Sequence, residues 1–121
     1  MDLRTKTREA GSVTIVDVHG RIVLGEESAA LRNLIIDLLR RGHKHILLNL
    51  GNVSYIDSSG LGSLVSAFSR VRKQGGALTL LSLTNKVHDA LQLAKLYTVF
   101  DIKDDEAEAI KSFDQSKTAG A

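Results

Sequence analysis

The chain has no cysteine, no proline and no tryptophan, and these absences exclude several kinds of protein. Without cysteine there is no disulfide, no thiol nucleophile and no cysteine-ligated zinc, which agrees with a reducing compartment. With aromatic residues at only 4%, the chain lacks the stacking platforms of a single-strand nucleic-acid binder. Its net charge of +2 is too small to indicate a polyanionic partner. We therefore expect no direct nucleic-acid contact.

Long apolar segments are also missing. Residues 1–8 are mostly polar and charged, and no later apolar run approaches the ~20 residues that cross a bilayer. We expect a cytoplasmic protein with no membrane insertion. The length of 121 residues and the hydrophobic fraction of 43% fit one globular domain. We predict a single domain over residues 1–113, followed by a flexible C-terminal tail over residues 114–121, which are small and polar.

The rest of the pattern alternates strands and helices. Strands are expected at residues 12–18 and 21–24, with His19-Gly20 as the turn between them, and then at 45–50, 77–81 and 99–102. Helical periodicity follows before Gly42, between Asp57 and Gly75, after Thr84, and from Asp104 to Phe113. Strands separated by single helices require right-handed crossovers. The sequence thus predicts an α/β fold with a mixed, largely parallel sheet, an N-terminal antiparallel edge hairpin and about four helices.

The segment from Ser54 to Gly62 places polar and glycine residues between an apolar strand and an amphipathic helix, where α/β folds carry functional loops. Asp57 or Ser58 suits the N-cap of that helix. Each glycine in its first turns costs about 1 kcal/mol relative to alanine, so the close approach of another backbone is the simplest reason for glycine there. A smooth face beside an exposed serine suits docking by a protein. The candidate partner-binding residues are Asp57, Ser59, Gly60, Gly62, Ser63 and Ser66.

Motifs for catalysis and for metal binding do not fit the same residues. Neither Ser58 nor Ser59 has glycine two positions before and two positions after it, as a nucleophile elbow requires. Gly60-Leu61-Gly62 lacks the third glycine of a dinucleotide fingerprint. His43 and His45 alternate along a strand, but two neutral ligands without an acidic third make a poor metal site. We expect no enzyme activity, no catalytic residue, no metal and no cofactor.

Asp57-Ser58-Ser59-Gly60-Leu61-Gly62, preceded by Leu48-Asn49-Leu50 and followed by Gly75-Gly76, resembles the STAS domain of bacterial anti-sigma-factor antagonists. The resemblance runs from about Val13 to Phe113, and it includes the family's Leu-x-x-Val-Phe ending at residues 96–100. It implies the STAS fold and a transcription-regulating phosphoprotein. By position, it implies that Ser58 is the phosphoacceptor, with Asp57 as a local organiser, and that Ser59 is the weaker candidate.

The resemblance also implies the partners. In the family, an anti-sigma factor that is also an ATP-dependent serine kinase phosphorylates the motif serine, and a PP2C-type phosphatase reverses the modification. The unphosphorylated antagonist binds the anti-sigma factor and so releases the sigma factor. Two alternatives stay open: a STAS adaptor of another signalling assembly or lipid transport complex, and a small hydrolase using Ser58, for which no base or oxyanion hole stands at a recognisable spacing.

The chain departs from the family pattern at one place. Many members carry an acidic residue in a Gly-x-x-Asp pattern in the second strand, whereas Val23 follows Gly20-Arg21-Ile22 here. Glu26 and Glu27 in the next segment are the candidates to replace that acid. The departure affects partner contacts and the identity of the kinase, but not the fold.

Overall fold

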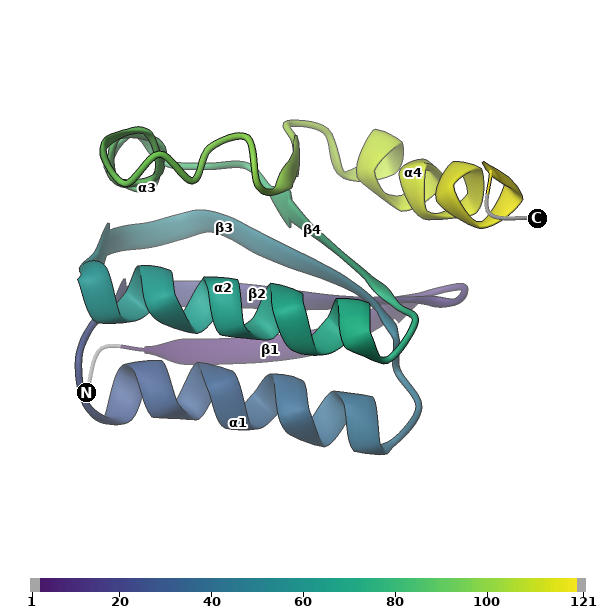
Figure 1. Cartoon of the computed structure of the whole chain (residues 1–121), viewed down its shortest axis with the longest axis horizontal. Helices are drawn as coiled ribbons and strands as arrows, with labels where there is room; N and C mark the ends of the chain where they lie inside the picture. The colour runs from purple at the N-terminus through teal and green to yellow at the C-terminus, as the bar shows by residue number, and fades with distance from the viewer. Residues whose placement is uncertain (1–2, 120–121) are drawn as a thin grey trace.

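A computed structural model of the chain describes residues 3–119, and the side chains of residues 3–114. Its elements follow the predicted order of strands and helices (Figure 1). They are β1 (Arg4–Ala10), β2 (Val13–Ile22), α1 (Glu26–Arg40), β3 (His45–Ile56), α2 (Ser58–Lys73), β4 (Ala77–Leu81), α3 (Asn85–Leu93), β5 (Asp101–Lys103) and α4 (Glu106–Ala119).

The strands form one sheet in the order β1-β2-β3-β4-β5. β1 pairs with β2 in the antiparallel sense, and every other pair is parallel. Figure 1 shows α1 and α2 lying side by side, in the same direction, over one face of this sheet. The predicted α/β class, with a mixed sheet and an antiparallel edge hairpin, is confirmed.

Two clusters of buried apolar side chains hold the layers together. The larger one lies between the sheet and helices α1, α2 and α3, and includes Val16, Leu48 and Leu64. The smaller one packs Ala109 and Phe113 of α4 against Ile15, Leu47 and Leu81. Since burial of apolar area is the main favourable term in folding, these clusters fix where the helices lie, and with them the ends of α1 and α2.

The antiparallel hairpin lies one strand earlier in the chain than predicted. β2 runs without a break from Val13 to Ile22 and so joins most of the two predicted strands, and His19-Gly20 lies inside it rather than in a turn. The turn is instead at Gly11, whose φ of 61° favours glycine. The sequence hid β1 because it is polar and mostly exposed. Arg8 holds it in place by donating to Asp17 at 2.7 Å on β2 and to Glu106 at 2.6 Å on α4.

Other boundaries differ as well. β3 continues to Ile56, so most of the segment predicted as a loop after Leu50 is strand; the β2–β3 register shifts twice along it. β5 begins at Asp101 rather than at Val99. The backbone of α4 continues to Ala119, past the predicted end at Phe113. Residues 120–121 and the side chains of residues 115–119 lie outside the described part, so the flexible tail stays a prediction.

Candidate functional site

Asp57 fastens the loop between β2 and α1 to the start of α2. As the N-cap of α2, its Oδ1 accepts the amide proton of Gly60 at 2.8 Å. Its Oδ2 accepts the amide proton of Leu24 at 2.9 Å, and its own amide donates to the Ile22 carbonyl at 3.3 Å. The side chain thus serves two backbone segments at once, which is more than an ordinary helix cap does.

These hydrogen bonds act on the charge of the Asp57 carboxyl. The Gly60 amide first, and the Leu24 amide second, lower the pKa of Asp57 below its usual value. Hydrogen bonds to the ionised form favour that form. Asp57 therefore carries a full negative charge beside Ser58 at neutral pH.

Gly60 provides the close backbone approach that the sequence predicted. A Cβ atom placed on Gly60 would lie 2.1 Å from the carbonyl oxygen of Ile22 and 2.7 Å from Cγ1 of Ile56. Gly62 differs, because a Cβ there would meet nothing within 4 Å. Of these two glycines, only Gly60 is required by packing, and it brings α2 against the end of β2.

The small residues of α2 divide between two sides of the helix. Ser63 is buried and donates from Oγ to the carbonyl of Ser28 on α1, at 3.3 Å. Ser59 and Ser66, at helical spacing from Ser63, are half-buried on the same side. Gly60 and Ser63 are both buried by the domain itself, and their part in partner binding stays a prediction.

The opposite side of α2 is open. Ser58 and Gly62 are exposed, and their spacing of four residues places them on one face of the helix. Ser58 opens α2 at the carboxyl end of β3, next to the end of β2. Of the two serines that follow Asp57, the structure thus leaves Ser58 the more accessible.

A shallow groove of about 370 Å³ runs from Ser58 toward α3. Its lining is mostly apolar and contains no Lys or Arg: Tyr55, Ile56, Asp57, Ser58, Leu61, Ala90, Leu93 and Ala94. Two of these large side chains are unusually exposed, Leu93 at 86% and Tyr55 at 45%, and Leu24 in the neighbouring loop is 75% exposed. Exposed apolar side chains gathered around one serine are typical of an interaction surface.

Sequence reasoning missed Leu24, Tyr55 and Leu93 as members of this surface. Leu93 carried one usable signal, since it falls off the apolar stripe of Val87, Ala90, Leu91 and Ala94 in its helix. Leu24 looked like the end of a strand, and Tyr55 like part of a polar loop. Their grouping depends on where β2, β3 and α3 meet in space.

The histidines do not converge. Nδ1 of His43 lies 3.0 Å from Oγ1 of Thr14, and the ring of His45 stacks beside Phe113. In the described part of the chain, no three His, Asp or Glu side chains gather in a way that could hold a metal ion. None of the helices within residues 3–119 is long and apolar enough to cross a membrane.

Comparison with known proteins finds a family domain that includes the Ser58 site. The family model for the STAS domain matches residues 4–109. The anti-sigma F factor antagonist of Paenibacillus polymyxa is 26% identical over 110 residues, which cover 91% of this chain and 94% of that protein. The match thus extends over nearly the whole length of both chains.

Solved structures agree with the fold. A Thermotoga maritima protein, described as a candidate anti-sigma factor antagonist, has a TM-score of 0.83 at 26% identity and covers 90% of this chain and 93% of its own. The anti-sigma factor antagonist SpoIIAA in its unphosphorylated form has a TM-score of 0.75 at 20% identity, and the match covers 90% of this chain and 95% of SpoIIAA. The phosphorylated form of SpoIIAA has a TM-score of 0.70 at 19% identity, and the match covers 90% of this chain and 98% of that one.

Proposed function

This chain belongs to the STAS domain family, and on that premise we propose that it is an anti-sigma-factor antagonist switched by phosphorylation of Ser58. The observation that carries the proposal is the position of Ser58: exposed, first in α2, beside the Asp57 cap and at the end of an apolar groove. The names of the Paenibacillus relative and of SpoIIAA support the antagonist role.

In the unphosphorylated state, the groove beside Ser58 binds the anti-sigma factor. Leu24, Tyr55 and Leu93 offer apolar area that a partner would remove from water, and an aromatic anchor such as Tyr55 often contributes much of the binding energy. Gly62, open to solvent on the same face as Ser58, lets the partner approach the helix backbone. Binding sequesters the anti-sigma factor and releases the sigma factor.

Phosphorylation opposes this binding through charge. A phosphate on Ser58 adds about −1.5 to −2 charges next to the ionised Asp57. No Lys or Arg lines the groove, so the groove itself offers the added charge no countercharge in the complex. Burial of an unpaired charge costs at least a few kcal/mol, which is enough to abolish binding. In the free protein the phosphate stays in water at the exposed first residue of α2, and no change of fold is needed.

The proposed partners are an anti-sigma factor that is itself a serine kinase and a PP2C-type phosphatase. The family's acidic residue is absent at Val23, and the structure places Glu26 and Glu27 next along the chain, in the first turn of α1. Of these two, Glu26 is the more exposed. We propose that Glu26 takes the place of the missing acid.

Phosphorylation by the cognate anti-sigma kinase with ATP, followed by tandem mass spectrometry, tests the proposal. We expect phosphate on Ser58, with Ser58→Ala unmodified and Ser59→Ala still modified. Ser59 is the matched control because it is the adjacent hydroxyl, half-buried on the α1 side. Phosphate mainly on Ser59, Ser63 or Thr84 would overturn the assignment. No phosphate on any residue would favour the STAS adaptor alternative.

A further inference from the structure

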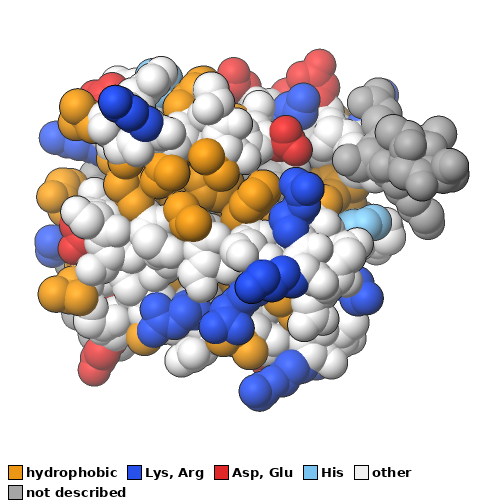
Figure 2. Space-filling model, viewed as in Figure 1, with side chains coloured by type: hydrophobic (Ala, Val, Ile, Leu, Met, Phe, Trp, Pro, Cys, Tyr) orange, Lys and Arg blue, Asp and Glu red, His pale blue; other side chains and the backbone are white. Residues whose placement is uncertain are grey.

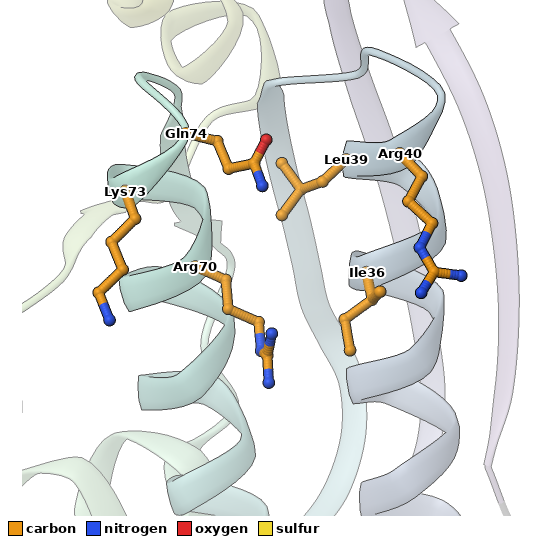
Figure 3. A pocket seen from close by; sticks show the side chains of 6 residues that line it. All are labelled: Ile36, Leu39, Arg40, Arg70, Lys73 and Gln74. Atoms are coloured by element: carbon orange, nitrogen blue, oxygen red, sulfur yellow. The ribbon is translucent and has the colours of Figure 1, made fainter.

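A second groove lies at the opposite ends of α1 and α2, away from Ser58. It has a volume of about 330 Å³ and lies between the last turns of the two helices (Figure 3). Its lining residues are Ile36, Leu39, Arg40, Arg70, Lys73 and Gln74. Ser58 and Arg70 are twelve residues apart in one helix, which separates them by roughly 18 Å along its axis. The two grooves are therefore distinct surfaces.

The cations of this groove, Arg40, Arg70 and Lys73, come from the last turns of α1 and α2. No acidic side chain lines it, and α2 contains no Asp or Glu anywhere along Ser58–Lys73. Among the described residues, Arg40, Arg70 and Lys73 make no ion pair, whereas the neighbouring Arg41 pairs with Asp37 at 3.0 Å. Arg72, next to this set, lies over the ring of Phe68. Figure 2 shows Lys and Arg side chains gathered over this part of the face.

Cations in a last helical turn complement the helix dipole, which explains why one of them stands in each helix. That explanation does not require three, because Arg41 already ends α1 and Arg72 already stands in the last turn of α2. Like charges brought close on two packed helices repel one another. An anionic partner bound between them would turn that repulsion into attraction.

The floor of the groove adds a second chemical feature. Leu39 is buried and Ile36 is half-buried, so the floor between the cationic rims is apolar. In Figure 3 the side chain of Arg70 reaches into the space between the helices, and the amide of Gln74 points toward Leu39. The groove thus presents an apolar strip with charged donors around it.

We propose that this groove, which we call the Arg40–Arg70 groove, binds an acidic segment of a partner protein, with an apolar residue of that segment seated over Ile36 and Leu39. Carboxylates on either side of the apolar residue would pair with Arg40, Arg70 and Lys73, where arginine can bind two carboxylate oxygens at once. The volume is at the low end of small-molecule pockets, and no aromatic residue lines the groove to stack on a base. These features favour a protein segment over a nucleotide or a nucleic acid.

The test uses a fluorescent peptide of alternating glutamate and leucine, with a control peptide carrying glutamine in place of glutamate. Fluorescence anisotropy measures binding to the full chain at about 0.05 M and about 0.3 M salt. We expect the acidic peptide to bind more tightly than the control, and the difference to shrink at high salt. The double variant Arg40→Glu/Arg70→Glu should lose about tenfold or more in affinity.

Lys86→Glu/Lys111→Glu is the matched control, because it changes the net charge by the same amount at exposed positions on α3 and α4. This control variant should lose less than twofold in affinity for the acidic peptide. Amide chemical shifts should move at residues 36–40 and 70–74 on addition of the peptide, which keeps the test valid if a variant fails to fold. Equal losses in both double variants, equal binding of both peptides, or shifts confined to the Ser58 groove would overturn the proposal.

A second copy of this chain is the competing occupant, since residues 101–108 carry Asp101, Asp104, Asp105, Glu106 and Glu108. Sedimentation velocity over a range of concentrations separates the two. A wild-type protein that remains monomeric supports an external partner. Self-association that the Arg40→Glu/Arg70→Glu variant abolishes would assign the groove to a second copy and contradict the proposal.

Discussion

Replacing Gly60 by alanine should destabilise the domain, whereas the same change at Gly62, two residues further along α2, should stabilise it. A Cβ at Gly60 would lie 2.1 Å from the Ile22 carbonyl oxygen, which also accepts the amide proton of Asp57. Both the added Cβ and the Ile22 carbonyl oxygen are fixed to the backbone, so neither can rotate away. The end of β2 and the first turn of α2 must therefore move apart, which weakens the Asp57 cap as well.

The magnitude follows from two opposing terms. Alanine is about 1 kcal/mol more favourable than glycine inside a helix, and this term acts at both positions. Overpacking a rigid site costs typically 1–3 kcal/mol, and more where backbone must shift. At Gly60 the neighbouring atom is backbone, so the cost lies at the upper end of this range, and we expect a net loss of up to about 2 kcal/mol. At Gly62, where a Cβ meets nothing within 4 Å, we expect a gain of up to about 1 kcal/mol.

Thermal and denaturant unfolding of the two variants provide the measurement. For a chain of this length, 1 kcal/mol corresponds to a shift of roughly 4 °C in Tm, so the two alanine variants should differ by several degrees. Each serves as the control for the other, because both make the same chemical change in the same helix. A Gly60→Ala variant as stable as the wild type would refute the close contact between α2 and β2.

Three further results are expected. Asp57→Asn should be less stable than the wild type at pH 7, and this difference in stability should disappear below about pH 4. Folding lowers the pKa of Asp57, so the carboxylate stabilises the fold at pH values above its pKa in the unfolded chain. That stabilisation is lost as the pH falls through its pKa in the folded protein. A gap that stays constant with pH would count against the carboxylate. Arg8→Ala should cost about 1 kcal/mol in urea unfolding, because it removes the bonds to β2 and α4. The change Arg4→Ala, at an exposed position of the same strand, should stay within about 0.5 kcal/mol of the wild type, and equal losses would contradict the role of Arg8. Gly62→Gln should leave unfolding unchanged or improved and weaken anti-sigma-factor binding about tenfold, and unchanged affinity would remove Gly62 from the interface.

Most of the fold could be read from the sequence because its central elements bury one face or two. β4 has the predicted bounds, Ala77–Leu81, and the helices after Asp57 and Thr84 begin where their caps indicated. β1 could not be found in this way, since its stability depends on pairing with β2 and on the distant Glu106, and neither leaves a local pattern. β3 was cut short for a similar reason: its last residues alternate in burial, with Val53 and Ile56 inward.

The sequence predicts where along the chain the site lies, but not which of its side chains are exposed. Asp57 as cap and Gly60 as close approach follow from local chemistry, and the structure confirms both. Which serines of α2 face outward depends on where α1 packs, and the sequence does not show that Ser63 lies on the α1 side. The bond from the Leu24 amide to Asp57 spans 33 positions in the chain, and no spacing rule reports it.

The most direct test of the switch is the affinity of the anti-sigma kinase for this protein with and without phosphate on Ser58, measured by calorimetry at two salt concentrations. We predict tight binding of the unphosphorylated protein and of Ser58→Ala, weaker binding of Ser58→Asp, and no measurable binding of the phosphorylated protein. Higher salt should recover part of the affinity lost in Ser58→Asp, because the repulsion near Asp57 is screened at a partly solvated interface. Equal affinity of the phosphorylated and unphosphorylated proteins at both salts would contradict the account.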